Sequence, residues 1–379
     1  MAEVSTPVDK LKTGMVVSDT VYGPSGRKLI ESGIAVTDEM IAMLKNYEVT
    51  QVMIFVAEQY KKIELPKAFP QVSSTNAAER FVEENGVRCL KIDSSAAKET
   101  HTVTIDRTKK IFAAVKAESF SPDALKQTVN DLVAGVMGNP QAFSNLSILK
   151  MKDEYTYAHS VDVAVLAALL GTALGMDKAS ITILSTAGLL HDVGKLLVPD
   201  TILNKPGKYT DPEMAQMKKH SFLGYKILKR ENIDERIANC VLEHHEWVNG
   251  KGYPFGKTGI HLDDFSRIIA VCDVYNALTT QRTYRDPMAP YAAVKAVITE
   301  AGTHLDHEFT KAFQRVVGVY PNGTVVTLSD GTTCRVIDQN PNVPLRPVLA
   351  LCAAGGGAKD GNIIINLSEQ KELFIKDVV

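Results

Sequence analysis

The chain has few of the features that mark secreted or membrane-spanning proteins. Its five cysteines are odd in number, widely scattered and without a CxxC motif. This pattern argues against a disulfide framework and against a thiolate zinc site, so a reducing cytoplasm is the expected location. The N-terminal residues MAEVSTPVDK contain no apolar signal core. The longest apolar run, at 163–174, is shorter than the ~20 residues that a membrane span needs, and it predicts a buried helix and no membrane insertion.

The sequence also lacks a net charge of either sign. Its 42 basic residues face 44 acidic ones, which gives a formal net charge of −2. Proteins that bind polymeric nucleic acid usually carry a strongly basic surface, so we expect no such partner, while a local basic pocket for a small phosphorylated ligand stays open. The 379 residues are 45% hydrophobic and 23% charged, an ordinary globular composition with room for two or three domains.

The first part of the chain predicts a small domain and a linker. Residues 1–65 predict an α+β domain with a regulatory or protein-contact role, because β-prone runs flank a Gly-Pro-Ser-Gly turn and a helix follows Thr37. Residues 66–104 contain prolines and polar residues and predict a linker region. Two short segments in it, 87–92 and 101–105, resemble strands.

The remaining chain predicts a helical domain and a β extension. Residues 105–318 are nearly all helical in pattern, with start signals such as Ser121-Pro122-Asp123 before apolar residues at helical spacing. Residues 319–379 contain the turn dipeptides Asn322-Gly323 and Asp330-Gly331 between Val/Thr-rich runs, which predict a hairpin. The expected fold class is therefore mainly α, an all-helical bundle with a small N-terminal α+β domain and a small C-terminal β extension.

Histidines and aspartates concentrate in the helical region. Asp192 ends an apolar helix and Asp273 lies inside an apolar stretch, and an unpaired buried carboxylate costs several kcal/mol. A metal ion would neutralise such carboxylates and satisfy imidazole nitrogens. The histidines on or at the end of helices with an apolar face are His159, His191, His220, His244 and His245. Five histidines and two aspartates are too many for one tetrahedral site, but they suffice for two metals that share a carboxylate.

The types of ligand restrict the metal. Imidazole and carboxylate without thiolate suit iron, manganese, zinc, nickel or cobalt. A mixed nitrogen and oxygen site with open positions favours iron or manganese. The expected cofactor is therefore two divalent metal ions, with iron or manganese preferred.

Five segments carry a resemblance to a known family. In chain order they are HSVDVA, LLHDVGKLLVPDTILNKPGKYT, MKKHSFLGYKIL, HHEWVNGKGYP and RIIAVCDVYNALTTQRTYR. Together they resemble an HD-GYP domain, a subgroup of the HD-superfamily phosphohydrolases, over about residues 110–320. The resemblance implies a first metal bound by His159, His191, Asp192 and Asp273, and a second bound by His220, His244 and His245, with Asp192 bridging. The first 65 residues and the segment YPNGTVVTLSDG resemble the small domain and the β extension that often flank such units.

The resemblance also implies an activity. Family members hydrolyse cyclic dinucleotides, chiefly cyclic di-GMP and for some members the 3′3′-cyclic GMP-AMP ring, to the linear dinucleotide or to GMP. Two metals about 3.5–4 Å apart can hold a bridging hydroxide and polarise phosphoryl oxygens. Asp192 and Lys195 are the expected catalytic residues, and Lys195 would contact a phosphate oxygen and protonate the leaving 3′ oxygen. The expected substrate-binding residues are Lys195, Tyr253, Arg282 and Arg285.

Three positions depart from this pattern or refine it. Some members have a glutamate one helical turn before the first histidine, where it supports a third metal; this chain has Tyr155, so we expect two metals. Asn249 stands where an aspartate is common. Glu246, beside the paired histidines, is expected to accept a hydrogen bond from an imidazole N–H.

Two other functions remain open from the sequence. The chain could be a cyclic-dinucleotide receptor with little or no turnover, because Asn249 departs from the family pattern. It could also be a general HD phosphohydrolase of nucleotides. Taken without the resemblance, Lys195 is an exposed lysine near a helix end and the RTYR segment is a solvated helix end. The expected small-molecule partner is the cyclic dinucleotide. The expected protein partner is a second copy of the chain, in a homodimer, or a signalling protein.

Overall fold

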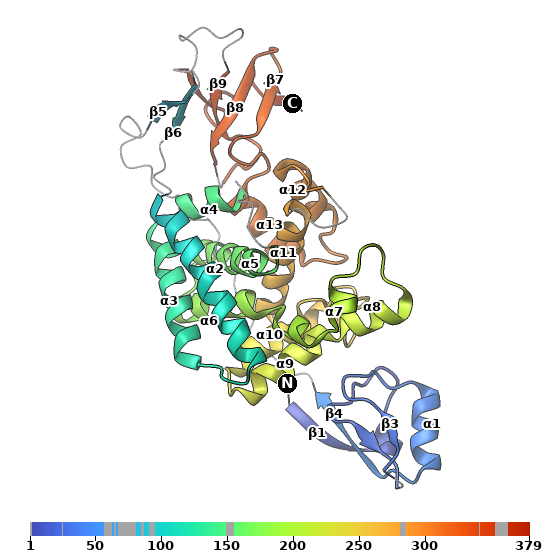
Figure 1. Ribbon diagram of the computed structural model, residues 1–379. Coiled ribbons are helices and arrows are strands. Elements are labelled where there is room, and N and C mark those ends of the chain that lie inside the picture. Colours follow the sequence, from blue (N-terminus) through green and yellow to red (C-terminus); the bar gives the residue numbers. More distant parts are fainter. Residues whose placement is uncertain are drawn as a thin grey trace.

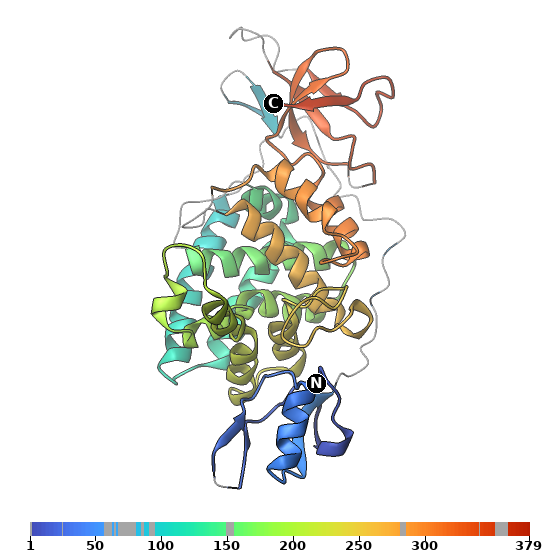
Figure 2. The ribbon, with the colours of Figure 1, turned by 90° about the vertical axis from the view of Figure 1, so that its right-hand side faces the viewer.

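The computed structural model has a helical bundle with a small β-containing region at each end (Figures 1 and 2). It describes residues 2–24, 26–56, 63, 66, 81–84, 87–90, 95–148, 155–280, 286–340, 342–352 and 363–379. The turned view of Figure 2 keeps the N-terminal region and the C-terminal sheet at opposite ends of the bundle. This arrangement confirms the expected fold class.

The N-terminal region packs two strand pairs against one helix. Its elements are β1 (Ala2–Pro7), η1 (Val8–Lys10), β2 (Val21–Tyr22), β3 (Lys28–Ile30), α1 (Asp38–Asn46) and β4 (Gln51–Val56). β1 pairs antiparallel with β4, and β2 with β3. Thr37 caps α1 by accepting a hydrogen bond from the Met40 amide, as its sequence position predicts. Val17, Leu44 and Val52 are buried in the small core.

The bundle is built around one helix that is buried on all sides. Its helices are α2 (Ser95–Lys116), α3 (Pro122–Gly138), α4 (Pro140–Ile148), α5 (Tyr155–Ala173), α6 (Lys178–Leu190), α7 (Asp200–Leu203), α8 (Asp211–Lys218), α9 (His220–Arg230), α10 (Glu235–Glu243), α11 (Asp264–Thr279), α12 (Pro290–Thr299) and α13 (His307–Val317), with the 3₁₀ turns η3 (Val193–Leu197) and η4 (Gly259–His261). The central helix is α5, which packs against α6, α11, α3 and α2. Its buried run Val163–Leu170 is the longest apolar stretch of the sequence. Among the helices that the structure describes, none has the length and apolarity needed to cross a bilayer.

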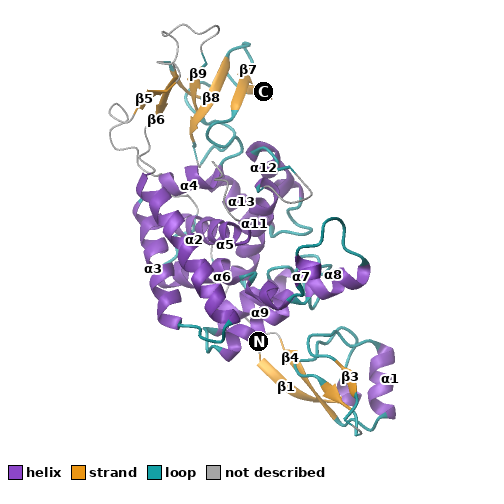
Figure 3. Cartoon of the chain, viewed as in Figure 1, coloured by secondary structure: helices purple, strands orange, loops and turns teal. Residues whose placement is uncertain are grey.

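The C-terminal region is an antiparallel sheet (Figure 3). Its strands are β7 (Val325–Leu328), β8 (Thr333–Asp338), β9 (Val348–Leu351), β10 (Ile364–Asn366) and β11 (Ile375–Val378), in the order β10-β9-β8-β7-β11. β7 and β8 form the hairpin expected at Asp330-Gly331, and Gly331 adopts a φ of 89° in its turn. Leu328, Cys334 and Leu349 are fully buried between the strands.

The segment expected to be a linker differs from that prediction. It contains the hairpin β5 (Phe81–Glu84) and β6 (Val87–Leu90), and β6 lies beside β9 and β8 of the C-terminal sheet. The helical region begins at Ser95 rather than near 105, and the strand expected at 101–105 is part of α2. Helical spacing buries one face of α2, at Ala97, His101, Thr104, Ile105, Thr108, Ile111, Phe112 and Val115. This burial overrides the β-propensity of its threonines, whose hydroxyls bond to carbonyls one turn earlier.

An aromatic contact joins the N-terminal region to the bundle. The Phe55 ring at the end of β4 lies edge-on to Phe222 and Tyr225 of α9 and to Phe255, with centroid distances of 5.8, 5.5 and 5.7 Å. Nζ of Lys219 also lies 3.0 Å from Oε2 of Glu31. These contacts anchor the N-terminal region to the helix that begins with His220.

Candidate metal centre

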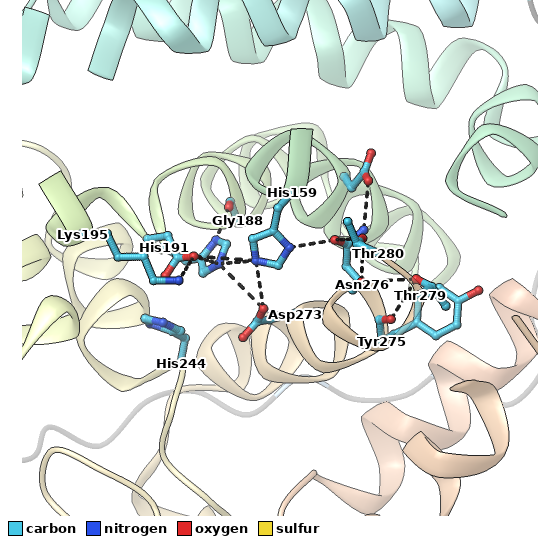
Figure 4. Close-up of polar contacts among 12 residues, drawn as sticks. His159, Gly188, His191, Lys195, His244, Asp273, Tyr275, Asn276, Thr279 and Thr280 are labelled. Atoms are coloured by element: carbon cyan, nitrogen blue, oxygen red, sulfur yellow. Dashed lines mark hydrogen bonds and ion pairs between the residues drawn. The ribbon is translucent and has the colours of Figure 1, made fainter. Parts of the chain in front are cut away.

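Five separate elements bring the histidines and aspartates of the sequence pattern together. His159 projects from the buried helix α5, and His191 and Asp192 follow the C-terminus of α6. Asp273 comes from α11, whose buried face carries it toward α5 (Figure 4). His220 begins α9, and His244 and His245 end α10. All seven predicted ligands therefore meet inside the bundle, although they are distant in sequence.

A first cluster consists of His159, His191 and Asp192, with Asp273 beside it. Nε2 of His159 lies 3.2 Å from Nε2 of His191 and 3.1 Å from Oδ1 of Asp273. Nε2 of His191 lies 3.3 Å from Oδ2 of Asp192. The side chains of His159, His191 and Asp192 are more than nine-tenths buried, and that of Asp273 is 11% exposed.

A second cluster consists of Asp192, His220, His244 and His245, whose potential ligand atoms all lie within 4.8 Å of one another. Nε2 of His220 lies 3.2 Å from Nε2 of His244 and 3.4 Å from Oδ1 of Asp192. The ring of His245 lies 4.0 Å from that of His244, centroid to centroid. Asp192 belongs to both clusters and directs one oxygen to each.

Main-chain carbonyls fix the protons of three of these imidazoles. Nδ1 of each ring donates to the carbonyl three residues earlier, at distances of 2.7, 2.8 and 2.7 Å for His191 to Gly188, His220 to Met217 and His244 to Val241. A carbonyl oxygen can only accept, so Nδ1 carries the proton and Nε2 presents a lone pair. The rings lie at helix ends, where the carbonyls of the last turn lack helical partners.

These proton positions leave acceptors facing acceptors. Nε2 of His220 and Nε2 of His244 lie 3.2 Å apart, and neither nitrogen has a proton to share with the other. Oδ1 of Asp192 is buried and has no hydrogen-bond donor among the described residues. Lone pairs and an unpaired carboxylate oxygen around one point require a cation. The residues present therefore fit a pair of divalent metals.

The electrostatics of the site favour the ligand forms of His220, His244 and Asp192. Burial lowers the pKa of His220 to about 4 and that of His244 to about 3, so both imidazoles are neutral at neutral pH. Burial alone would raise the pKa of Asp192, but the charge of Lys195 holds it well below the usual range. Neutral imidazoles and ionised carboxylates are the states that bind metals.

Lys195 and Tyr253 lie at this centre, as their sequence positions predict. Nζ of Lys195 lies 2.6 Å from Oδ2 of Asp192, and its side chain is 28% exposed (Figure 4). The Tyr253 ring lies 4.8 Å from the His245 ring, and burial raises the pKa of its hydroxyl, which therefore stays protonated. Arg282 and Arg285 lie outside the described residues.

The loop after the paired histidines folds back against the end of α10. A Cβ on Gly252 would lie 2.3 Å from the Trp247 amide nitrogen, so only glycine allows this close approach. Glu246 accepts hydrogen bonds from the amides of Phe255 and Lys257, at 2.6 and 3.0 Å, rather than from an imidazole as expected. The prediction failed because the loop returns its own amide groups to this buried carboxyl.

Asn249 has no contact with either cluster among the described residues. Its exposed side chain accepts a hydrogen bond from the Lys251 amide at 3.0 Å. An aspartate would accept the same bond. The departure from the family pattern at this position therefore keeps the hydrogen bond that the Lys251 amide donates.

Two residues at the site were not singled out from the sequence. Nζ of Lys218 lies 5.0 Å from the centre of the Tyr253 ring, a cation–π contact beside His245 and its neighbours. Its position two residues before His220 was the available signal. Oδ1 of Asn276 accepts a hydrogen bond from Nδ1 of His159 at 2.7 Å, and its position one helical turn after Asp273 was the signal.

Family models match two parts of the chain. Residues 144–309 match the HD domain, and residues 325–379 match the KOW domain associated with HD domain. The first match contains all seven residues of the two clusters. The second match covers the C-terminal sheet.

Curated relatives match between 44% and 58% of the chain. A cyclic di-GMP phosphodiesterase of Pseudomonas aeruginosa is 38% identical over 220 residues, 58% of this chain and 53% of that protein. A cyclic di-GMP phosphodiesterase response regulator of Xanthomonas campestris is 34% identical over 169 residues, 44% of this chain and 45% of that protein. A 3′3′-cGAMP-specific phosphodiesterase of Vibrio cholerae is 33% identical over 175 residues, 46% of this chain and 38% of that protein.

These alignments are partial. The chain spans about half the length of the first curated relatives it matches. Among solved structures, the HDG"Y"P protein Bd1817 of Bdellovibrio bacteriovorus aligns with a TM-score of 0.49 and 17% sequence identity, over 83% of this chain and 99% of that chain.

Proposed function

The chain belongs to the HD-GYP type of HD-domain proteins, and we propose that it is a metal-dependent phosphodiesterase that hydrolyses a cyclic dinucleotide. Cyclic di-GMP is the preferred candidate substrate and 3′3′-cyclic GMP-AMP the second. The relatives named for these two activities are 38% identical to this chain over 220 residues and 33% identical over 175 residues. The products are the linear dinucleotide and, after a second cleavage, the mononucleotides.

One observation carries this proposal. Asp192 places one carboxylate oxygen beside His191 and the other beside His220, so a single side chain joins the two buried clusters. A shared carboxylate is the arrangement that holds two metals close together for phosphodiester hydrolysis. When bound, such a pair activates water at neutral pH and stabilises charge on the phosphoryl oxygens.

The chain's own residues supply positioning and a proton. In our proposal the ammonium of Lys195, held 2.6 Å from Asp192, contacts a phosphate oxygen and gives its proton to the leaving 3′ oxygen. The water oxygen becomes bonded to phosphorus as the P–O3′ bond breaks, and the proton that the water loses passes to solvent, from which Lys195 regains its own. The protonated Tyr253 hydroxyl and ring orient the substrate beside His245. Arg282 and Arg285 are proposed phosphate contacts from the family resemblance alone.

The wider setting is part of the same proposal. The two metals are iron or manganese, with zinc, nickel and cobalt as alternatives that the same ligands accept. The protein acts in the cytoplasm, in keeping with its free cysteines Cys240, Cys272, Cys334 and Cys352. The N-terminal region supplies contacts to a second copy or to a signalling protein.

The decisive experiment combines turnover with binding. The full chain is loaded with Mn²⁺ or, without oxygen, with Fe²⁺, and incubated with cyclic di-GMP and 3′3′-cyclic GMP-AMP while products are separated by chromatography. We expect linear dinucleotide or mononucleotide from at least one ring. Tight binding without any product would show a cyclic-dinucleotide receptor in place of an enzyme. The absence of both binding and product would reject both functions.

Variants of Lys195 test its role in the reaction. Lys195→Ala should lower kcat by about 10²–10⁴-fold, the usual contribution of a general acid. Lys195→Arg should recover binding but little of kcat, because a guanidinium does not release its proton at neutral pH. Equal turnover of wild type and both variants would remove Lys195 from the mechanism.

A further inference from the structure

A continuous chain of buried polar side chains runs from helix α2 to His159. Nε2 of His101 lies 2.7 Å from Oδ1 of Asp162, and Nδ2 of Asn276 lies 3.0 Å from Oδ2 of the same carboxylate. Oδ1 of Asn276 lies 2.7 Å from Nδ1 of His159. Asn276 is fully buried, and His101 is 9% exposed. The part that joins Asn276 to His159 is drawn in Figure 4.

The direction of each hydrogen bond in this chain is fixed by Asp162. Its carboxylate can only accept, so the amide nitrogen of Asn276 must face it and the amide oxygen must face His159. A flipped amide would place two oxygens 3.0 Å apart, at the present distance between Asn276 and Asp162. The amide oxygen then receives the Nδ1 proton of His159, and Nε2 of His159 presents its lone pair to the first cluster.

His159 needs such a side-chain partner because of its place in the fold. His191, His220 and His244 lie at helix ends and donate to carbonyls three residues earlier. His159 lies within α5, where the carbonyls of the preceding turn accept the hydrogen bonds of the helix. A hydrogen-bond partner from another helix therefore sets its proton and its ring orientation.

We infer that His101, Asp162 and Asn276 are positioning residues of the metal centre, which act by holding His159 in the tautomer and orientation that bind the first metal. The inference rests on the metal pair of the proposed function. It extends the centre to α2, which precedes the matched HD domain, since His101 lies outside residues 144–309. Such outer partners typically change metal affinity by about 10–100-fold when they are removed.

An exchange of the two central side chains tests the order of donors and acceptors. Asn276→Asp puts two carboxylates face to face, and it should lower the affinity for one of the two Mn²⁺ ions by about 10–100-fold. Adding Asp162→Asn restores a donor between them, because the new amide at 162 donates to the carboxylate at 276 and still accepts from His101. The double variant should therefore bind Mn²⁺ more tightly than Asn276→Asp alone.

His101 is tested by a matched pair of variants. His101→Leu removes the donor to Asp162 and should lower the Mn²⁺ affinity of the first cluster. His101→Gln keeps an N–H donor and should bind Mn²⁺ there with nearly the affinity of the wild type. Bound Mn²⁺ is counted by electron paramagnetic resonance in the full chain after chelation and titration. In a His220→Ala background, which disables the second cluster, the single remaining Mn²⁺ should show the same loss.

Two outcomes would overturn the inference. Equal Mn²⁺ affinity in wild type and His101→Leu would show that the network does not reach the metal. If His101→Leu lowered the affinity for both Mn²⁺ ions equally, and also lowered the unfolding temperature of the metal-free protein, the role of the network would be purely structural. No cyclic dinucleotide is present in these titrations, so a failure of the proposed activity leaves their result unchanged.

Discussion

Oδ1 of Asp192 lies 3.4 Å from Nε2 of His220, and no hydrogen bond joins the two atoms. Both side chains are almost fully buried. Nδ1 of the imidazole donates its proton in a hydrogen bond to the Met217 carbonyl, and the carboxylate carries no proton, so a cation between Oδ1 and Nε2 would satisfy both atoms. The pair therefore indicates a metal more directly than the number of histidines does.

Replacing Asp192 should empty both clusters. Asp192→Asn removes the shared negative charge and presents an N–H₂ group to one of the imidazoles, so we expect the bound metal to fall by more than about tenfold. Metal per chain is measured by inductively coupled plasma mass spectrometry after gel filtration. Asp200→Asn, the same change at an exposed aspartate, is the control and should keep both ions. Two ions retained in Asp192→Asn would contradict the shared ligand.

Gly194 should not tolerate a side chain. A Cβ there would lie 1.9 Å from the His220 carbonyl oxygen and 2.4 Å from the Gly224 nitrogen, so the backbones of η3 and α9 would have to separate. Gly194→Ala should lower the free energy of unfolding by about 2–4 kcal/mol and lower the metal content, because Asp192 and His220 move apart. Urea denaturation measures the first effect.

The matched control for this glycine is Gly138. It lies in α3, and a Cβ there would meet no atom within 4 Å. Gly138→Ala should leave stability unchanged or raise it by up to about 1 kcal/mol, since alanine is the better helix former. A similar loss in both variants would mean that the backbone contact at Gly194 is not the cause.

Phe55 should couple the N-terminal region to α9, the helix that begins with His220. Its ring contacts Phe222 and Tyr225 of α9 and also Phe255, two residues after Tyr253. Phe55→Ala should cost about 3–5 kcal/mol of packing and weaken metal binding or turnover as well. Limited proteolysis of the N-terminal region reads the first effect, and Mn²⁺ titration reads the second.

Tyr22→Ala is the control for Phe55, because Tyr22 is an aromatic residue that is 59% exposed in the same region. It should change neither the proteolysis pattern nor the Mn²⁺ affinity. If Phe55→Ala loosened the N-terminal region without any change at the metals, the aromatic contact would be an anchor and not a route of regulation.

Stability should depend on pH through Glu246. Burial raises the pKa of its carboxyl from 4.5 to about 7, so the folded chain holds this proton more tightly than the unfolded chain does. This contribution to stability is fully present below about pH 4.5 and is lost as the pH rises through about 7. Glu246→Gln does not titrate, so the wild type should lose about 2 kcal/mol relative to it between pH 5 and pH 8.

The measurement for Glu246 is chemical denaturation of metal-free protein across this pH range. The other titrating groups are shared by the two proteins, so their effects cancel in the difference. Glu99→Gln, at an exposed position of α2, is the control and should follow the wild type. A constant difference between wild type and Glu246→Gln would mean that the carboxyl is ionised throughout.

The sequence could predict the fold class and the meeting of the cluster residues because both depend on local patterns. A continuous apolar run marks α5 and a largely apolar pattern marks α11, and the carboxylates of Asp192 and Asp273 stand out in those apolar surroundings. The ordered motifs indicated an HD-GYP domain, and the family model that matches residues 144–309 is that of the HD domain. The metal roles of the individual residues remain predictions that the variants above test.

The remainder depended on contacts that no local pattern contains. The segment 101–105 favours a strand by its β-branched residues, and only burial against the bundle makes it part of α2. For the same reason no motif of the sequence marks His101 as part of the site. Its contact with Asp162 joins residues separated by 61 positions.

The separation of the cluster residues along the chain has a consequence for folding. The two clusters draw on residues between positions 159 and 273, in helices that must all be packed before the ligand atoms come within reach of one ion. An unfolded chain would not offer this geometry, so ions bound here would add their binding free energy to the native state alone. Bound metal would therefore raise the free energy of unfolding, and a chelator should lower the unfolding temperature of the folded chain.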